Sequence, residues 1–325
     1  MTIDALILKA LHAAQDCGVS GADLSQQLGV SRAAVWARIE ELRCLGYDIS
    51  ASPHRGYRLI SCPDLLHADD LASRLGPVQV IGRDLRVFQE TTSTNDVVEK
   101  LARDGVAEGA VVFAESQTKG RGRLGRKWHS PAGGGLWFSV LLRPKLPPQQ
   151  ITQLIVISAT AVRRALAQHT AARLEIKWPN DVLINGRKAA GILTELSAEL
   201  DCVRHVILGI GVDVNQNASQ FPVELRKRAT SLKVETGRAV GRADLAVTLL
   251  RELDADYARL TAGRFADVAN EWERYCTTLG QEVVIRTGER RIRGRAESLG
   301  EDGALLLRTE HGHVERVMGG DVSLE

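Results

Sequence analysis

The chain has 325 residues, of which 44% are hydrophobic and 25% are charged, and its formal net charge is +2. This composition is typical of a soluble globular protein, and the length allows two or three domains around a sizeable core. So small a net charge gives no argument for nucleic-acid binding. The longest apolar run, 151–162, is interrupted by polar residues and too short to span a bilayer.

Five cysteines are scattered along the chain and predict reduced thiols rather than a disulfide framework. They are Cys17, Cys44, Cys62, Cys202 and Cys276, and no two form a CxxC pair. An odd number of cysteines at irregular spacing, with charged residues inside the first apolar stretch, predicts a cytoplasmic protein without a signal peptide. We expect no zinc site at His311 and His313, because no cysteine or carboxylate stands at ligand spacing from them.

Residues 1–62 predict three helices followed by a two-stranded hairpin. Apolar residues near the N-terminus recur at helical spacing, and Ser20 and Ser31 stand where side-chain caps would begin a second and a third helix. Gly46 ends the third helix, and two short extended runs joined by Pro-His-Arg-Gly follow it. This order of elements is typical of a winged helix-turn-helix domain.

Basic side chains of this segment fall on the third helix and on the wing, where contacts to DNA would be made. The overall charge does not decide the matter, because six basic residues are balanced by six acidic ones. A small helical cap packed on the main domain is the alternative. We favour DNA binding because of where the arginines fall. The candidate contacts are Ser31, Arg32, Arg38 and Arg55, accompanied by Arg43 and Arg58.

The middle of the chain, residues 63–275, alternates extended apolar runs with helical stretches. The expected strands include 111–114, 136–142, 174–178, 190–196 and 203–214, and the expected helices are 96–103, 151–168 and 242–260. Asn185-Gly186 is a strong signal for a two-residue hairpin turn. Hairpins combined with long helices indicate an α+β domain with a mixed or antiparallel sheet, not a doubly wound one.

Residues 276–325 contain short extended runs separated by turns at 287–288, 301–303 and 311–312. This pattern predicts a small C-terminal β-barrel of the SH3-like kind. One run carries four arginines, which could touch nucleic acid or phosphate. We favour a solvated strand face for them. They are Arg290, Arg291, Arg293 and Arg295.

The densest chemical signal is the segment Lys119–Trp128, KGRGRLGRKW, which holds five basic residues and three glycines without an acid. Glycines let backbone N–H groups approach an anion closely, and arginines add paired donors. A dinucleotide-binding fold is not expected because no helix is predicted after the glycines. A P-loop is not expected because Arg126 stands where that motif needs lysine. The segment therefore predicts a site for phosphates or for a phosphate and a carboxylate, against the alternative of a solvated basic loop.

Three further signals are weaker when each is taken alone. Lys177-Trp-Pro-Asn-Asp181 places a cation, an amide and a carboxylate after a strand, but a capped turn explains it equally well. Lys188 opens an apolar strand, where a charge at the rim is the plainer interpretation. Ser93-Thr94-Asn95, ahead of a predicted helix, is by itself an N-cap.

Taken together, these residues resemble the bacterial biotin–protein ligases, and the domain order resembles the bifunctional members that also repress the biotin operon. The matching strings are STND, AESQTKGRGRLGRKWHSP, GGLWFSVLLRP, KWPNDVLINGRKAAGILTEL and GIGVDVN, in order across most of residues 90–215. The winged-helix and C-terminal segments match the family's outer domains, so the resemblance spans nearly the whole chain. Asp213 departs from the pattern, because the family usually has asparagine there.

The resemblance implies a role for each matching residue. The residues that would hydrogen-bond biotin are Ser93, Thr94, Asn95 and Gln117. The loop that closes over biotin and its adenylate would contain Arg121, Gly122 and Arg123. Lys188 would contact the reacting carboxylate or the acyl-adenylate, and it forms the catalytic set with Lys177, Arg121 and Arg123. Trp128 would face adenine, with Asn180 and Asp181 near the nucleotide and Mg²⁺. The family also has a loop ordered by adenine, here 215–237.

The implied reaction has two steps and needs ATP and Mg²⁺. Biotin's carboxylate attacks the α-phosphorus of ATP, and cations neutralise the two anions. A lysine of a biotin carboxyl carrier protein then attacks the mixed anhydride, which the loop shields from water. The resemblance further implies an adenylate-bound homodimer on operator DNA, with biotinyl-AMP as corepressor. Two alternatives are a biotin-sensing repressor without transfer activity and a lipoate–protein ligase, although the RRxSGGG-type string of the latter is not found at the loop.

Overall fold

The structure is a computed structural model that describes residues 1–199 and 202–324. Glu325 and the side chain of Cys202 lie outside the described part, and the four described cysteines, 17, 44, 62 and 276, are free thiols. The chain divides into two compact units. The first comprises Met1–Pro77 with Gly241–Val247, and the second comprises Val78–Val240 with Thr248–Glu325.

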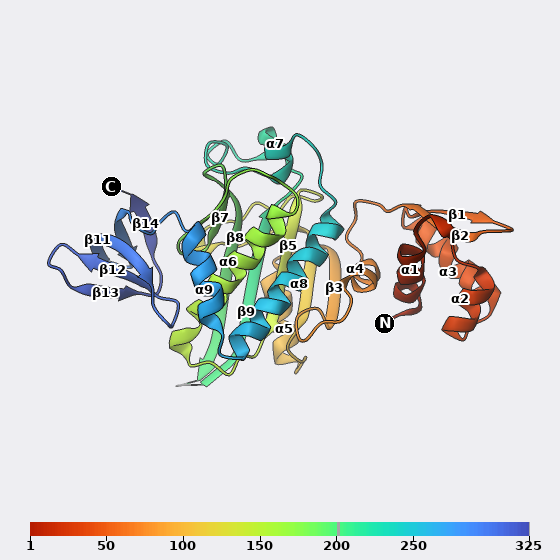
Figure 1. Ribbon diagram of the computed structural model, residues 1–325, viewed down its shortest axis with the longest axis horizontal. Helices are drawn as coiled ribbons and strands as arrows, with labels where there is room; N and C mark the ends of the chain where they lie inside the picture. The colour runs from red at the N-terminus through yellow and green to blue at the C-terminus, as the bar shows by residue number, and fades with distance from the viewer. Residues whose placement is uncertain (200–201, 325) are drawn as a thin grey trace. The chain divides into compact units, whose positions relative to one another are not determined.

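The first unit begins with the predicted winged helix-turn-helix (Figure 1). Its elements are α1 (Ile3–Ala14), α2 (Gly21–Leu28), α3 (Arg32–Cys44), the hairpin β1 (Asp48–Ser52) and β2 (Gly56–Ser61), and α4 (Ala68–Leu75). The hydroxyls of Ser20 and Ser31 accept bonds from the backbone N–H groups of Ala22 and Ala34, so both predicted N-caps are confirmed. The three N-terminal helices and the wing surround a small core that includes Leu8, Leu24, Val35, Ile39 and Ile49.

The second unit is built on a seven-stranded sheet with the order β3-β4-β5-β9-β8-β7-β6. Its strands are β3 (Asp84–Thr91), β4 (Ala110–Gln117), β5 (Gly135–Leu142), β6 (Leu174–Lys177), β7 (Asp181–Ile184), β8 (Arg187–Glu199) and β9 (Cys202–Asp213). β3 and β4 are parallel and all other neighbours are antiparallel, which confirms the predicted mixed sheet. Asn185 and Gly186, between β7 and β8, both have positive φ, as a two-residue type I′ hairpin turn requires.

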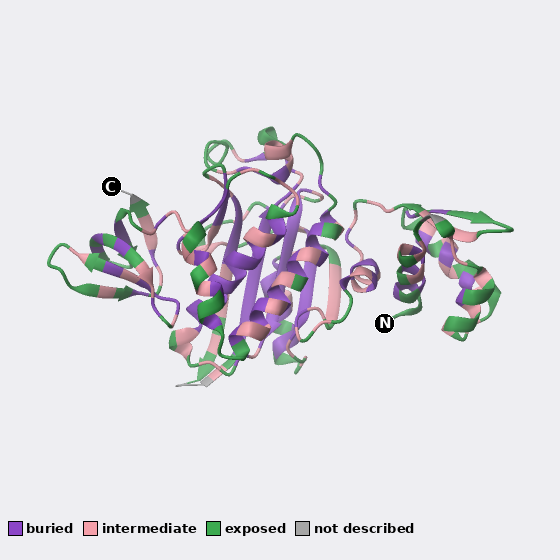
Figure 2. Ribbon diagram, in the orientation of Figure 1, coloured by how far each residue is buried: buried purple, intermediate pink, exposed green. Residues whose placement is uncertain are grey.

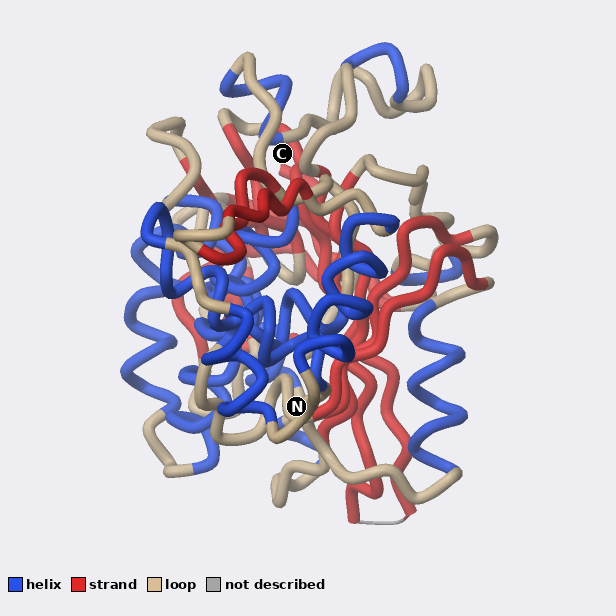
Figure 3. Tube along the Cα trace, turned by 90° about the vertical axis from the view of Figure 1, so that its right-hand side faces the viewer, coloured by secondary structure: helices blue, strands red, loops and turns tan. Residues whose placement is uncertain are grey.

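Helices flank both faces of this sheet (Figure 3). They are α5 (Thr94–Arg103), α6 (Thr152–Ala167), α8 (Arg242–Thr261) and α9 (Phe265–Tyr275), while the short helix α7 (Leu232–Thr236) belongs to the segment between β9 and α8. α5 packs on β4, β5 and β9, whereas α6 packs on β6, β7, β8 and α9. The central strands are buried along most of their length (Figure 2). Every residue of β5 is buried, as expected of a central strand that is covered on both faces.

The C-terminal segment forms a five-stranded antiparallel sheet with the order β13-β12-β11-β10-β14. Its strands are β10 (Glu282–Thr287), β11 (Arg290–Leu299), β12 (Leu305–Thr309), β13 (Val314–Val317) and β14 (Asp321–Leu324). The four arginines of β11 alternate with buried residues or precede them and are all exposed, as a solvated strand face predicts. Among the described residues, no helix is both long and apolar enough to cross a membrane.

Candidate active site

One face of the central sheet has a flat floor made by glycines in neighbouring strands. Gly191 of β8 lies opposite Gly211 of β9, and the indole of Trp128 covers both. A Cβ atom at Gly211 would lie 2.5 Å from that ring and one at Gly191 would lie 2.8 Å from it, so neither position accepts a side chain without movement. On β5, the other neighbour of β9, Trp137 pairs with Gly211. Its ring contacts the Trp128 ring edge-to-face, with the ring centres 6.3 Å apart. Gly211 of GIGVDVN and Gly191 of β8 therefore make room for Trp128, whereas Gly209 makes room for the side chain of Asn95.

The basic loop 119–128 folds back on itself as an irregular hairpin. The backbone N–H of Gly122 donates to the carbonyl of Arg126 at 2.7 Å, and that of Trp128 donates to the carbonyl of Gly120 at 2.9 Å. Leu124, at the tip, has a φ of 56° and is 69% exposed. The next regular strand or helix is β5, so the segment does not open a helix as a dinucleotide fingerprint would. This hairpin directs alternate arginines to different neighbours.

Arg121 and Arg123 are separated by one residue but have different environments. The guanidinium of Arg121 pairs with Asp96 at 2.7 Å and with Glu195 at 3.2 Å, and it is 37% exposed. Arg123 is more deeply placed, and its Nη1 donates to the amide oxygen of Asn180 at 3.2 Å. Burial lowers the pKa of Arg123, while the charges of Asp321 and Asp181 act in the opposite direction. Of the two, Arg123 is therefore the one directed at the KWPND motif.

A buried polar network joins the start of α5 to β4 and β5. Gln117 Oε1 accepts from the backbone N–H of Thr94 at 2.8 Å, and Gln117 Nε2 donates to Ser130 Oγ at 2.9 Å. Thr94 Oγ1 lies 2.7 Å from Ser139 Oγ, which donates to Asn95 Oδ1 at 2.5 Å. The structure thus brings together three of the four residues predicted to bind biotin, and it adds two serines that the sequence analysis missed.

Two details of this network bear on ligand binding. Asn95 is 4% exposed, yet its Nδ2 donor is a buried group without a hydrogen-bond partner in the described structure. Such a donor is costly unless something accepts from it. Ser93, the fourth predicted residue, is 3% exposed and occupies the N-cap position of α5, but its side chain makes no capping hydrogen bond. α5 begins at Thr94, two residues earlier than predicted.

The KWPND motif forms the turn between β6 and β7. Lys177 ends β6 and pairs in register with Asp181, the first residue of β7, and the Trp178–Pro179 peptide bond between them is cis. Asn180 Nδ2 donates to the carbonyl of Ile192 at 2.7 Å, and its Oδ1 accepts from the loop. The turn therefore joins β8 to the loop.

Lys188 is where the motifs meet. Its Nζ forms an ion pair with Asp181 Oδ1 at 2.6 Å and lies 5.1 Å from the centre of the Trp128 ring. At the end of β9, Asp213 is 5% exposed, and its Oδ1 accepts from Gln216 Nε2 at 2.5 Å. Burial raises the pKa of Asp213 well above its ordinary value, although the charge of Lys188 and the bond from Gln216 favour ionisation. A cation, two carboxyl groups and an indole thus share one corner of the sheet.

The predicted DNA contacts in the first unit differ in availability. Arg32 and Arg55 are exposed, and Ser31 is exposed while its hydroxyl caps α3. Arg38 instead donates both its Nε and its Nη2 to the carboxylate of Asp4, at 2.6 and 2.5 Å, and pairs with a glutamate one turn further along α3. Arg38 thus has a structural role inside the domain.

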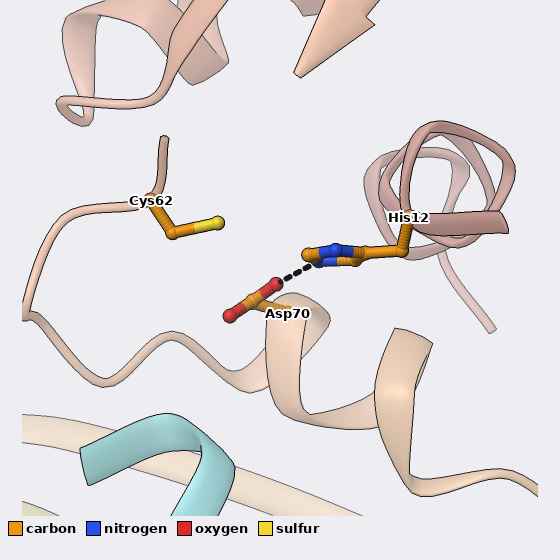
Figure 4. Close-up of side chains that lie close together, drawn as sticks. All are labelled: His12, Cys62 and Asp70. Atoms are coloured by element: carbon orange, nitrogen blue, oxygen red, sulfur yellow. Dashed lines mark hydrogen bonds and ion pairs between the residues drawn. The ribbon is translucent and has the colours of Figure 1, made fainter. Parts of the chain in front are cut away.

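A metal-like cluster in the same unit joins residues that are distant in sequence (Figure 4). His12 Nε2 lies 2.8 Å from Asp70 Oδ1, and Cys62 offers its sulfur within 4.8 Å of both ligand atoms. Arg74 already pairs with Asp70 at 2.7 Å, and its Nε lies 3.2 Å from His12 Nε2. A guanidinium so placed supplies the charge that the buried carboxylate needs, so this is an ion-pair network.

In the second unit, a cavity of about 550 Å³ is lined by residues that include Arg163 and Tyr275. None of the predicted site residues lines it.

Three family models match the chain. The model described as the biotin/lipoate A/B protein ligase family matches residues 87–213, an HTH domain model matches residues 5–58, and the biotin protein ligase C-terminal domain model matches residues 278–325. The three matches follow the predicted order of domains.

Proteins that are similar over more than nine-tenths of their length are named as bifunctional ligase/repressors. The chain is 39% identical to the bifunctional ligase/repressor BirA of Bacillus subtilis over 306 residues, which covers 94% of each chain. It is 32% identical to the bifunctional ligase/repressor BirA of Escherichia coli, over 94% of this chain and 92% of that protein. Among solved structures, the biotin protein ligase of Aquifex aeolicus in complex with biotin and ATP is 34% identical, with a TM-score of 0.64 over 75% of this chain and 99% of that one.

Proposed function

This chain belongs to the bacterial family of bifunctional biotin–protein ligases and repressors, and from that membership we propose that it joins biotin to a lysine of a biotin carboxyl carrier protein. The reaction consumes ATP and releases pyrophosphate when biotinyl-5′-AMP forms, and it releases AMP when the biotinyl group is transferred to the lysine. Residues 63–275 carry the chemistry, residues 1–62 bind DNA, and residues 276–325 form the C-terminal domain.

The buried network around Thr94, Asn95 and Gln117 is the observation that carries this proposal. A ureido ring has two N–H donors and one carbonyl acceptor, so it needs acceptors and a donor held at fixed positions. The unpaired Nδ2 of Asn95 supplies a donor, and the side-chain oxygens of Asn95, Gln117 and Ser139 are potential acceptors. Because these groups are buried, a ligand that lacks matching groups would leave them unsatisfied.

The nucleotide side of the proposed site is cationic. Lys188 and Arg123 would neutralise the biotin carboxylate and the α-phosphate as they approach each other, and Lys177 would add charge beside Asp181. Trp128 presents a ring for adenine beside Asn180's turn. Mg²⁺, with ATP phosphates as its other ligands, would be held by the carboxylate of Asp181, since Mg²⁺ sites commonly use one or two carboxylates. Bound there, Mg²⁺ would supply further neutralisation of the phosphates.

The second step requires protection of the mixed anhydride until a carrier lysine arrives. The loop that contains Arg121, Gly122 and Arg123 would provide it, with Arg123 on the adenylate and Arg121 anchored to Asp96 and Glu195. No covalent enzyme nucleophile is needed, because the carrier's own lysine attacks the activated carboxyl group.

The test is the intact mass of a biotin carboxyl carrier domain after incubation with the protein, biotin and Mg·ATP. We expect a gain of one biotin that requires ATP and falls at least about 100-fold in rate in Lys188→Ala. Lipoate offered in place of biotin should give no product. No mass gain with biotin would reject the ligase, and modification by lipoate alone would identify a lipoate–protein ligase.

A second function, operator binding, is favoured by the N-terminal helix-turn-helix. We propose that biotinyl-AMP acts as corepressor by favouring a homodimer, which places two α3 helices on a two-fold symmetric operator. The measurement is salt-dependent binding to DNA from upstream of biotin-synthesis genes, with and without biotin and ATP, alongside sedimentation of the protein. Binding that is absent, or equal in both conditions, would reject the repressor.

A further inference from the structure

A carboxylate outside every motif is the centre of a second polar cluster. Glu235 lies on the short helix α7, and its side chain is only 5% exposed. Its Oε1 accepts from Arg187 Nη2 at 2.6 Å and from Thr230 Oγ1 at 2.6 Å, and its Oε2 accepts from Asn185 Nδ2 at 2.7 Å. One buried carboxylate thus joins the β7–β8 hairpin to the segment that ends at α7.

The same two stretches of chain also hold the backbone of Lys188. Its N–H donates to the carbonyl of Arg228 at 2.8 Å, and its carbonyl accepts from the N–H of Thr230 at 2.8 Å. These two bonds form a parallel bridge between Lys188 and Ala229. The lysine proposed to act on the reacting groups is therefore fixed on one side by segment 215–237, outside the regular ladder of the sheet.

Glu235 stabilises both sides of that bridge. Arg187 is the residue before Lys188, and Thr230 donates one of the two bridge bonds, so the carboxylate bonds to a neighbour on each strand of the bridge. Charge-assisted hydrogen bonds are stronger than neutral ones, and here the accepting carboxylate is buried although Arg187 is 38% exposed. Without the carboxylate, the hairpin and segment 228–230 would lose the side-chain links that keep them in register.

We propose that Glu235 is the positioning residue for Lys188, and that through it segment 215–237 sets where the lysine Nζ lies. This inference rests on the proposed ligase function. The segment starts beside Asp213, where Gln216 bonds that carboxyl group and the Gln216 carbonyl accepts from Ser231 Oγ at 2.7 Å. A nucleotide bound beside Asp213 would thus be linked to the position of Lys188 through the hydrogen bonds of segment 215–237.

The test is a double-mutant cycle on the first chemical step, measured as single-turnover formation of biotinyl-AMP at saturating biotin and Mg·ATP. We expect Glu235→Ala to lower this rate about 10- to 100-fold, as a misplacement of the order of 1 Å does. The dissociation constant for biotin should be unchanged, because Thr94, Asn95 and Gln117 are not part of this cluster. In a Lys188→Ala background, Glu235→Ala should have no further effect.

Two additional variants separate positioning from general stability. Glu235→Gln keeps an acceptor for Thr230 and should recover part of the rate. Glu108→Ala is the matched control, since that carboxylate also accepts hydrogen bonds, from Arg143 N and Tyr257 Oη, both at 3.0 Å. Its adenylation rate should equal that of the wild type. Additive losses in the cycle, or an equal loss in Glu108→Ala, would overturn the inference while the ligase function stands. Absence of adenylate with the wild-type protein would remove both.

Discussion

The basic loop 119–128 and helix α3 are both rich in arginine, yet the structure uses their arginines differently. In α3, Arg38 is bound by Asp4 and a glutamate of its own helix, and Arg43 is bound by Glu40 and by a backbone carbonyl. In the loop, Arg123 contacts an amide oxygen. The count of arginines is thus a poor guide to the charge available for a ligand.

Neighbouring carboxylates cause the difference. The sequence of α3 places acids three residues from Arg38 and Arg43, and folding adds Asp4 from α1. The loop has no acid among its ten residues. Folding brings acids to Arg121 and to Arg126, which pairs with Asp321, whereas Arg123 is half-buried against the turn of the KWPND motif. A half-buried arginine whose hydrogen-bond partner is uncharged is the one to test first.

Among the arginines of these two regions, the largest expected effect is that of Arg123→Gly. Removing this guanidinium should shorten the lifetime of bound biotinyl-AMP by about 10- to 100-fold, because the loop then lacks its contact beside the adenylate. The measurement is escape of labelled adenylate from the purified complex after a chase. Arg126→Gly is the matched control, since Arg126 is 62% exposed and pairs with Asp321. An adenylate held as long as in the wild type would show that the loop is not the clamp.

Arg38→Ala should destabilise the N-terminal domain without affecting ligation. The side chain of Asp4 is 10% exposed, so the mutation leaves a largely buried carboxylate without its cation. We expect a loss of about 1–3 kcal/mol in the free energy of local unfolding. Hydrogen exchange of amides in α1 and α3 measures it, with Arg32→Ala as the control. Unchanged protection would mean that the ion pair contributes nothing in solution.

Arg32→Ala and Arg55→Ala should weaken DNA binding without lowering the stability of the N-terminal domain. Both arginines are exposed, so stability should be retained while affinity for operator DNA falls. Each phosphate contact that is lost should reduce the slope of log K against log salt by about 1. Titrations at several salt concentrations test this, and an unaltered slope would exclude the two residues from the DNA interface.

At Asp213, burial affects the pKa of the carboxyl group more strongly than the nearby charge of Lys188 does. Its pKa is raised in the folded protein above the ordinary aspartate value of about 3.9. The native state therefore binds more protons than the unfolded state above that pH, and the stabilising contribution is lost as the pH rises toward the folded-state pKa. Asp213→Asn lacks this titration, so its melting temperature relative to the wild type should increase with pH. A difference that stays constant from about pH 4 to 8 would contradict the raised pKa.

Much of the fold could be predicted from local patterns. The caps of α2 and α3, the helix α6, the hairpin at Asn185-Gly186 and the strands of the central sheet depend on short-range propensity and periodicity, which are visible in the sequence. β3, α4 and α9 were not predicted from these patterns. The edge strand β3 is mostly half-buried or exposed and has a weak apolar pattern, and it forms only by pairing with β4.

The motifs of the catalytic segment were also recognisable before the structure was known. Their residue types and order predicted a site for anions, and the resemblance to biotin–protein ligases, whose family the comparisons confirm, gave those residues expected roles. Ser130, Ser139 and Glu235 were not predicted to take part in the site. The two serines lie inside the matching strings, but serine is common in any soluble chain and nothing in their spacing pointed to Thr94 or Gln117. Glu235 lies outside those strings altogether.

The sequence by itself determined which segments form helices, strands and turns, and which stretches bring cations and glycines together, because these properties depend on neighbours a few residues away. The tertiary structure alone decided which arginine keeps its charge for a ligand, which glycines admit the Trp128 ring, and which carboxylate supports Lys188. Those outcomes depend on contacts between residues that are far apart in the sequence, such as the ion pair of Arg126 with Asp321. A local pattern carries no information about such distances until the chain has folded.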